Sequence, residues 1–346
     1  MKTKPGKTFG RKSLALAKYK LLILTDHAVH SADNSLYALA RSLRRHPLCR
    51  RLEVASRGFA DNDAFFKNHQ TDEFWVSEAA DDFAFDPSGK HFKTGWKKSN
   101  LGQYDGILLR LPHPISEAFF DFLTRRFPEQ KIINRPSGIL KTSSKAFLLE
   151  VPELCPPMQL CRNWDEIEAF SKNFPIVLKP LRGYGGKGIF KIENGEIWEG
   201  DQPVDRLIFE KFIRAGGQEF LGMQYMKNVY EGDKRILVVN GKVLGASLRL
   251  PRPGSWMCNI SQGGHSRYAD ADAGELEIAH RLSQKLLPLG VVIFGFDTLA
   301  DDDGRRLLSE VNVLSIGGIA AMQQESGRPV MQQTADLLWD YFLENI

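Results

Sequence analysis

The stretch "KPLRGYGGKGIF", residues 179–190, places four glycines within six residues. Its segment 183–188 has the spacing GxGxxG, which occurs in dinucleotide-binding turns and in the glycine-rich loops of kinases. A dinucleotide-binding turn requires a helix directly after the glycines, so that the pyrophosphate lies on the helix N-terminus. Here the following residues, IFKIENGEIW, alternate like a strand and contain an Asn-Gly turn. The pattern therefore predicts a glycine loop between two strands.

Other phosphate-binding motifs also fail to match this loop. The Walker A motif needs Ser or Thr after its lysine, whereas Lys187 is followed by Gly188. The downstream sequence contains neither the HRD…N nor the DFG motif of protein kinases. Glycines do allow backbone N–H groups to approach phosphate oxygens, and they accept positive φ angles. The loop alone is thus equally compatible with a structural turn and with a flap over a nucleotide.

Two lysines favour the nucleotide flap. Lys179 ends the strand before the loop, and Lys145 lies in a predicted helix over 143–149. Either lysine alone would be interpreted as a solvated side chain. Together on one phosphate chain, they would neutralise charge that ATP must shed during phosphoryl transfer.

The stretch "FGFDTLADDDGRRLLSEVNVLS", residues 294–315, predicts a metal site. Asp297 ends one apolar strand, and Glu310 and Asn312 end the next. Glu310 and Asn312 are two residues apart and therefore point to the same face of their strand. With Asp297 from the neighbouring strand, they form a set of three side chains that offer oxygen atoms. Such a set suits Mg²⁺ bridging ATP phosphates, with Mn²⁺ as the alternative. We interpret the acidic run 301–304 as a solvated turn.

Composition indicates an ordinary globular protein of two or three domains. The chain has 346 residues, of which 42% are hydrophobic and 25% charged, and no apolar run approaches the length of a membrane span. Seven of the 46 basic side chains lie in the first twenty residues. The rest of the chain has 39 basic and 42 acidic side chains, so it carries no net positive charge, which argues against a nucleic-acid partner. Four scattered cysteines without a CxxC pair fit a reducing cytoplasm.

Strand and helix patterns alternate over residues 19–135, which predicts an α/β domain with a parallel sheet. Strands are expected at 19–25, 51–55, 104–111 and 131–134, and helices at 31–45 and 116–127; residues 61–99 give no clear pattern. Beyond Pro136, strands are expected at 174–180, 189–193, 196–198, 207–212, 220–226, 235–239, 242–250, 292–299 and 307–313. Asn240-Gly241 predicts a hairpin. Helices are expected at 164–173, 272–287 and 334–343.

Taken together, these segments resemble the ATP-grasp superfamily and, within it, the bacterial glutathione synthetase family. The resemblance lies in residues 104–114, 133–140, 143–148, 176–192, 232–243, 263–266 and 294–313. It implies an α/β fold, α+β in part, in which an ATP-grasp unit follows an N-terminal parallel-sheet α/β domain. We expect a disordered basic arm over 1–18, the α/β domain over 19–135, a lid subdomain over 136–219 and a C-terminal core over 220–346.

The resemblance also implies a carboxylate–amine ligase, in which ATP phosphorylates a carboxylate and an amine attacks the acyl phosphate. The substrates would be small molecules; whether the enzyme forms a homo-oligomer is left open. Implied ATP contacts are Lys145, Lys179, Gly183, Tyr184, Gly185, Gly186, Gly188, an adenine hinge at Met223, Gln224, Tyr225 and Met226, and Asp233 at the ribose. Implied metal ligands are Asp297, Glu310 and Asn312. Implied catalytic residues are Arg235 and Arg249, for the substrate carboxylate and acyl phosphate, and Asn259, for the transferred phosphoryl group.

Other polar residues of these segments carry weaker signals. We interpret His265 as a loop residue and Arg110 as a charge at a strand end. The spacing of Arg235 and Arg249 about the hairpin does not fix their relative face.

Some positions depart from the family pattern. After Asn312 the family has Val-Thr-Ser-Pro and then an arginine, whereas this chain reads VLSIGGIAA. Residues 257–259 read Met-Cys-Asn in place of Arg-Gly-Asn, and residues 1–103 match poorly. Three hypotheses stay open: a glutathione synthetase using γ-glutamylcysteine and glycine, a ligase for another acid or amine, and an ATP-binding protein without ligase activity.

Overall fold

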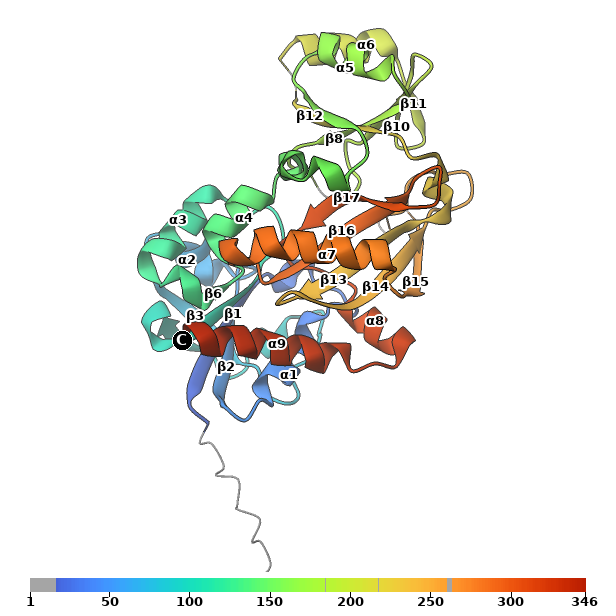
Figure 1. The fold of residues 1–346 in the computed structure, drawn as a ribbon. Helices are drawn as coiled ribbons and strands as arrows, with labels where there is room; N and C mark the ends of the chain where they lie inside the picture. The colour runs from blue at the N-terminus through green and yellow to red at the C-terminus, as the bar shows by residue number, and fades with distance from the viewer. Residues whose placement is uncertain (1–16, 184, 217, 260–262) are drawn as a thin grey trace, which may run out of the picture.

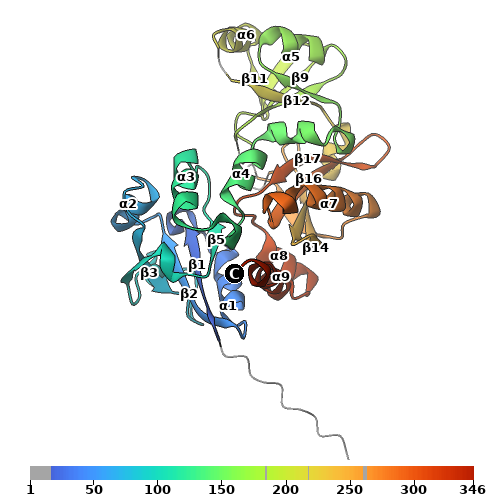
Figure 2. The ribbon, with the colours of Figure 1, turned by 60° about the vertical axis from the view of Figure 1, so that its left-hand side comes forward.

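The computed structural model describes residues 17–183, 185–216, 218–259 and 263–346. Most of the basic arm expected over 1–18, and Tyr184 of the glycine loop, lie outside these ranges. The described chain forms three sheets. In both ribbon views the second sheet stands above the third, with the first sheet beside the third (Figure 1, Figure 2).

The first sheet has the strand order β4-β3-β2-β1-β5-β6. Its strands are β1 Tyr19–Thr25, β2 Cys49–Ser56, β3 Glu73–Glu78, β4 Lys97–Asn100, β5 Gly106–Arg110 and β6 Ile132–Ile133. β1 pairs in parallel with β2 and β5, and β5 with β6, as the α/β pattern predicts. β3 and β4, from the segment that gave no clear sequence pattern, are antiparallel strands at one end of the sheet, with β4 at its edge.

Helices cover both faces of the first sheet because its strands are buried on both sides. Leu21 and Ile23 share a core with α1 Leu36–Arg44, whereas Leu22 and Leu24 share another with α3 Glu117–Arg126. The short helices α2 Asp63–Phe66 and α4 Pro136–Thr142 complete this region.

The second sheet is antiparallel, with the order β11-β10-β9-β8-β12-β7. Its strands are β7 Met158–Cys161, β8 Ile176–Pro180, β9 Phe190–Glu193, β10 Glu196–Glu199, β11 Gln202–Val204 and β12 Phe220–Gln224. The helices α5 Trp164–Ser171 and α6 Arg206–Arg214 cover one face (Figure 1). β12 begins at residue 220, so this sheet extends past the residue 219 at which we placed the lid boundary.

The strand expected at 207–212 is wrong, because these residues form α6. Asp205 caps the helix by accepting a hydrogen bond from the backbone N–H of Ile208, at 3.0 Å. Only Phe209 and Ile213, four residues apart, are buried in this helix, which is helical rather than alternating spacing. The apolar run is too short for periodicity alone to separate the two structures.

The third sheet has the order β15-β14-β13-β16-β17, all antiparallel. Its strands are β13 Asp233–Val239, β14 Lys242–Leu250, β15 His265–Ala269, β16 Ile293–Ala300 and β17 Arg306–Asn312. The predicted Asn240-Gly241 hairpin is confirmed, with φ angles of 45° and 75° at its two turn residues.

The third sheet lies between two helical layers. Ile236 and Val238 of β13 face α7 Ala273–Leu286, and Leu237 and Val239 face α8 Ile319–Ser326 and α9 Val330–Asn345. α9 also packs on α1, where the indole N–H of Trp339 donates to the carbonyl of Leu43 at 3.1 Å. This helix therefore joins the first and third sheets (Figure 1). No helix in the described ranges is long and apolar enough to cross a membrane.

Asn134, 2% exposed at the end of β6, makes a second junction between these sheets. Its side-chain oxygen accepts the backbone N–H groups of Val292 (2.7 Å) and Ile293 (2.9 Å). Its amide donates to the carbonyls of Ile293 (2.6 Å) and Val313 (2.8 Å). One side chain thus satisfies four backbone bonds near the ends of β16 and β17.

We expect Asn134→Ala to lower the free energy of unfolding by about 3–5 kcal/mol, because buried backbone groups lose their partners. Asn173→Ala, at an exposed asparagine with one 3.4 Å bond, is the control and should change it by less than about 0.5 kcal/mol. Denaturant titration measures both values. Equal losses in the two variants would contradict the junction role.

Candidate active site

The predicted nucleotide residues come together in a cavity between the second and third sheets. The predicted residues that line it are Lys145, Lys179, Gly183, Gly185, Gly186, Met223, Gln224, Tyr225, Met226, Asp233, Asn259, Asp297 and Glu310. An adjoining second cavity is lined by Arg235, Arg249 and Asn312 and shares Lys145, Gly183, Gly185, Asn259 and Glu310 with the first. Gly188 lines neither cavity, and Tyr184 lies outside the described residues.

The end of the first cavity near residues 223–226 is an apolar slot. Val177, Ile189, Val229 and Leu299 line it together with Trp256, and their side chains form one small cluster. The hinge is anchored, because the backbone N–H groups of Gln224 and Tyr225 donate to the carbonyls of Pro157 (2.9 Å) and Pro175 (2.8 Å). Such a slot suits a flat aromatic base.

Our sequence reasoning missed this apolar lining. Trp256 and Cys258 stand within three residues of the predicted Asn259, but one sequence gives no sign that their side chains face the cavity.

Two lysines line the polar end of the cavity, where it adjoins the second cavity, and the Nζ of Lys179 also lies 3.7 Å from the sulfur of Met223. The buried Nζ of Lys179 donates to the carbonyl of Ser309 at 2.9 Å, and burial lowers the pKa of Lys179 although Glu310 opposes this. The Nζ of Lys145 donates to the carbonyl of Gly183 at 2.6 Å and lies 3.4 Å from Glu310. Both predicted lysines therefore meet at β17, where an anionic ligand would find two cations.

The glycine loop covers this polar end. Gly185, Gly186 and Gly188 all have positive φ, between 67° and 75°. A Cβ on Gly186 would lie 2.8 Å from the Met257 side chain and 2.9 Å from the Asn259 side-chain oxygen. Both the backbone conformation and the close approach to Asn259 therefore require glycine.

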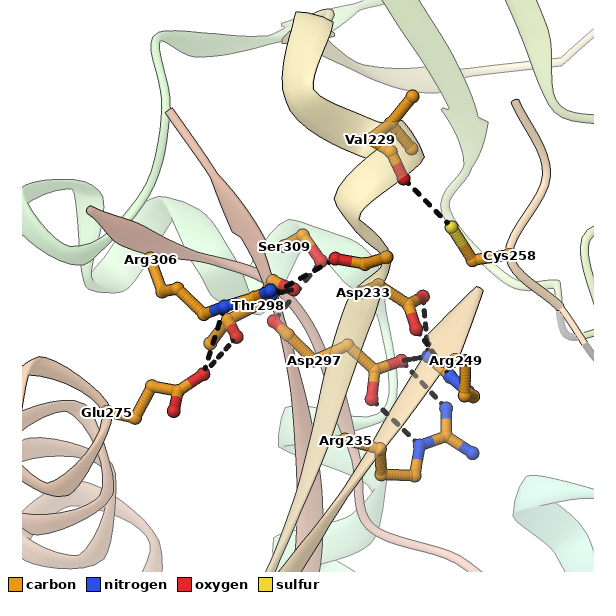
Figure 3. A network of polar contacts seen from close by, with 11 residues as sticks. Val229, Asp233, Arg235, Arg249, Cys258, Glu275, Asp297, Thr298, Arg306 and Ser309 are labelled. Carbon is orange, nitrogen blue, oxygen red and sulfur yellow. Dashed lines mark hydrogen bonds and ion pairs between the residues drawn. The ribbon is translucent and has the colours of Figure 1, made fainter. Parts of the chain in front are cut away.

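An ion network of two aspartates and two arginines lines the two cavities, and Figure 3 shows its contacts. Asp297, 2% exposed, accepts from Arg235 at 2.8 and 2.7 Å and from Arg249 at 2.8 Å. Arg249 also pairs with Asp233 at 2.6 and 2.7 Å. The strand register places Asp233 opposite Arg249, and Arg235 opposite Asp297. The two arginines, whose relative face the sequence could not fix, therefore reach the same carboxylate.

Burial and the neighbouring charges act in opposite directions on the pKa values of this network. Burial by itself would raise the pKa of Asp297, but Arg235 and Arg249 outweigh it and hold that pKa well below its usual range. Burial raises the pKa of Asp233, which Arg249 offsets in part. For Arg249, the two carboxylates outweigh burial and raise its pKa.

The predicted metal ligands lie on two paired strands. Asp297 stands opposite Glu310 in the register, and Gly295 stands opposite Asn312. No cluster of three His, Cys, Asp or Glu that could hold a metal occurs among the described residues, so the set is two carboxylates and an amide. The side-chain amide nitrogen of Asn312 is buried without a described partner. One or two carboxylates completed by substrate phosphates suit Mg²⁺, and the residues fit such an ion.

The structure also shows where the residues with weaker sequence signals lie. The interpretation of His265 as a loop residue is wrong, because His265 begins the edge strand β15; it is exposed and lines neither cavity. Arg110 stands at a strand end, as expected, because it is the last residue of β5, but it is also 6% exposed and lines a third cavity, which the sequence did not indicate. In the acidic turn, Asp302 and Asp303 are exposed, whereas Asp301 is buried and accepts the backbone N–H groups of Asp303 and Arg305.

Comparison with known proteins adds three sequence matches. A family model described as prokaryotic glutathione synthetase, ATP-grasp domain, matches residues 144–327. A glutathione synthetase of Bradyrhizobium diazoefficiens is 31% identical over 260 residues, which are 74% of this chain and 78% of that relative. A glutathione synthetase of Nitrosomonas europaea is 28% identical over 340 residues, which are 94% of this chain and 98% of that relative.

Solved structures show the fold. D-cycloserine synthetase DcsG superposes with a TM-score of 0.64 at 12% identity, over 93% of this chain and 99% of that one. The ATP-grasp ligase PsnB, in complex with a phosphomimetic variant of its minimal precursor, Mg and ADP, superposes with a TM-score of 0.57 at 14% identity, over 95% and 99%. The ATP-grasp fold expected from the sequence is confirmed.

Asp297→Asn should lower the free energy of unfolding at pH 7 by about 3–5 kcal/mol, because the partly buried Arg235 loses its bidentate partner and the buried Arg249 loses one of its two carboxylate partners. The folded-state pKa of Asp297 is depressed, so its stabilisation is present above the unfolded value of about 3.9 and is lost as pH falls through the folded value. Denaturant titrations should therefore show the difference shrinking below about pH 4. Asp303→Asn, at an exposed aspartate of the acidic turn, is the control. A difference that is constant with pH would contradict this assignment.

Proposed function

Because this chain belongs to the prokaryotic glutathione synthetase family of ATP-grasp ligases, we propose that it joins γ-glutamylcysteine to glycine while converting ATP to ADP and phosphate. The observation that carries the proposal is the meeting of two cavities. Lys145, Asn259 and Glu310 line both, so a nucleotide in one would present its terminal phosphate to a substrate in the other.

We place the nucleotide in the first cavity. The apolar slot beside Met223–Met226 would hold adenine, and Asp233 would bind the ribose. The phosphates would lie toward Lys145 and Lys179, under the glycine loop, where backbone N–H groups and two cations offset their charge. Asp297, Glu310 and Asn312 would hold Mg²⁺, or Mn²⁺ in its place. The ion would neutralise part of the negative charge of the ATP phosphates.

The reaction needs an electrophile, because a free carboxylate resists attack by an amine. A carboxylate oxygen of the acid attacks the γ-phosphorus of ATP, and ADP leaves. The amine nitrogen then attacks the acyl carbon, phosphate leaves, and the nitrogen loses a proton. Arg235 and Arg249 line the second cavity, and guanidinium groups there would hold the substrate carboxylate and stabilise the developing charge.

The ion network orients these arginines for that role. It engages Nε and Nη2 of each guanidinium with Asp297 or Asp233. A guanidinium fixed in this way loses little freedom when it binds an anion. Asn259, between the glycine loop and the second cavity, would contact the transferred phosphoryl group.

One observation favours a second candidate, a ligase of the same chemistry with a different acid or amine. The second cavity is lined by Leu314 and Ile316, where the family has threonine and proline. These side chains make its wall more apolar than the family pattern would. A ligase with a different acid or amine would differ in the second cavity and would keep the same nucleotide-binding residues.

The experiment that separates these candidates is Mg²⁺-dependent release of ADP and phosphate from γ-glutamylcysteine, with and without glycine. Release that requires both substrates supports glutathione synthesis. No release, with ATP still bound, supports the second candidate, and a panel of acids and amines then identifies the pair.

Glu310→Gln should reduce turnover at least roughly 100-fold, because it removes a carboxylate from the metal set and the charge that faces Lys145. The midpoint of thermal unfolding should stay near that of the unmodified protein, because Glu310 is only half-buried. Glu277→Gln, at an exposed glutamate of α7, is the matched control. Full activity of Glu310→Gln would remove this residue from the metal site.

A further inference from the structure

A third cavity lies where the carboxyl ends of β1 and β5 meet the loop after β17. It is lined by residues 29–31 and 33–36 after β1, by Arg110 and Pro112 of the β5 end, and by Ser315 and Gly317. Pro112, Ser315 and Gly317 also line the second cavity, so the two spaces adjoin. A substrate bound at Arg235 and Arg249 could therefore extend toward Arg110.

Topology favours a ligand here. In the strand order β2-β1-β5, the chain leaves β1 for α1 on one face of the sheet and leaves β5 for α3 on the other. Where a parallel sheet reverses direction in this way, the loops separate, and ligands bind in the crevice at the carboxyl ends of the strands. Arg110 is the last residue of β5 and stands at this crevice.

Arg110 is a buried cation with donors to spare. Its side chain donates from Nη2 to the carbonyl of Ile316 at 3.1 Å. Its Nε and Nη1 are buried and have no partner among the described residues. No carboxylate in the described ranges lies within ion-pair distance of it. Burial lowers the pKa of this guanidinium to about 10, which still leaves it charged at neutral pH.

A second buried donor lies beside it. The hydroxyl of Ser315 is also buried without a described partner, and Ser315 has a φ of 42°, which only a few non-glycine residues adopt. Nearby His30 supplies no negative charge, and burial, with help from His27 and Arg110, lowers its pKa to about 4. Buried donors without partners cost stability, so both groups are arranged for an anionic ligand rather than for the fold.

We propose that Arg110 and Ser315 bind the carboxylate at the end of the acid substrate remote from the carboxyl group that is activated. Asp33 lines the same cavity and is exposed, so it would take an ammonium group on the adjacent carbon. The ligand class is an α-amino-acid head group. In γ-glutamylcysteine this is the α-amino and α-carboxyl end of the glutamyl residue, an assignment that rests on the proposed function.

The test compares γ-glutamylcysteine with 4-aminobutyrylcysteine, which lacks only the glutamyl α-carboxylate. Arg110→Met should raise the KM for γ-glutamylcysteine about 10- to 100-fold, the range for a lost charged hydrogen bond, with the KM values for ATP and glycine unchanged. For 4-aminobutyrylcysteine, the unmodified enzyme should already show the high KM, and Arg110→Met should raise it no further. A variant that weakens both acids equally would overturn the proposal.

Stability separates a ligand site from a structural role. Because Arg110 lacks a counter-ion, Arg110→Met should leave the thermal midpoint unchanged or raise it. Arg135→Met is the control: this arginine also lies between the first and third sheets, donates to the hydroxyl of Tyr341 at 3.0 Å, and lines none of these three cavities. The control should lower the midpoint without changing the KM for the acid. A large fall in midpoint for Arg110→Met, with an unchanged KM, would overturn the proposal.

Two further arms keep the test decisive. If Arg110→Met does not fold, Arg110→Lys is tested in its place, because lysine keeps the positive charge but cannot make the two parallel hydrogen bonds of a guanidinium. This variant should still raise the KM for γ-glutamylcysteine about 10-fold. An unchanged KM would overturn the proposal. If the unmodified enzyme does not turn over γ-glutamylcysteine at all, the proposed function fails by itself. The subsite then predicts that every active acid in a screen carries a second carboxylate, and activity with monocarboxylates alone would contradict it.

Discussion

The carboxylate of Asp297 accepts hydrogen bonds from arginines on two different strands, and only one register of the third sheet permits this. Arg235 lies directly opposite Asp297, whereas Arg249 reaches it across β13 while pairing with Asp233. A slip of one residue would turn every one of these side chains to the other face. Because burying an unpaired charge costs stability, the network favours both this sheet register and this position of the cationic wall of the second cavity.

The same arrangement explains how chemistry is divided between the sheets. The second sheet supplies Lys179 and the glycine loop, and the third supplies the ion network and the candidate metal ligands. The first sheet supplies Arg110 and the loops around the third cavity. The proposed phosphate contacts, together with Ser315 of the third cavity, lie within residues 144–327, which match the family model, whereas Arg110 and residues 29–36 of the third cavity lie before them.

Much of this could be predicted from the sequence where local patterns are strong. The apolar run of β1, the Asn-Gly hairpin and the two-residue spacing of Glu310 and Asn312 each carry their own signal, and the structure has these strands. Local sequence patterns failed to predict secondary structure where it depends on contacts with distant parts of the chain. The run that forms α6 is short and apolar, so only packing on the second sheet decides that it is a helix.

The sequence indicated which residues belong to the candidate site, but not how their side chains are arranged in space. A register irregularity between Leu237 and Val238 lies between Arg235 and the turn, so counting residues could not place Arg235 relative to Arg249. The burial of Arg110 depends on a loop more than two hundred residues later in the chain, which no local pattern reports. The apolar slot was missed for the same reason, since its walls come from both sheets.

The proposed ligase activates a carboxylate by transfer of the γ-phosphoryl group of ATP. Positional isotope transfer tests it most directly. With γ-glutamylcysteine labelled with ¹⁸O in the cysteinyl carboxylate, glycine and Mg-ATP, mass spectrometry of the released phosphate should find one ¹⁸O atom per turnover, because the carboxylate oxygen that attacks phosphorus leaves with it. Product formed with unlabelled phosphate, or with AMP and pyrophosphate in place of ADP and phosphate, would contradict an acyl-phosphate ligase.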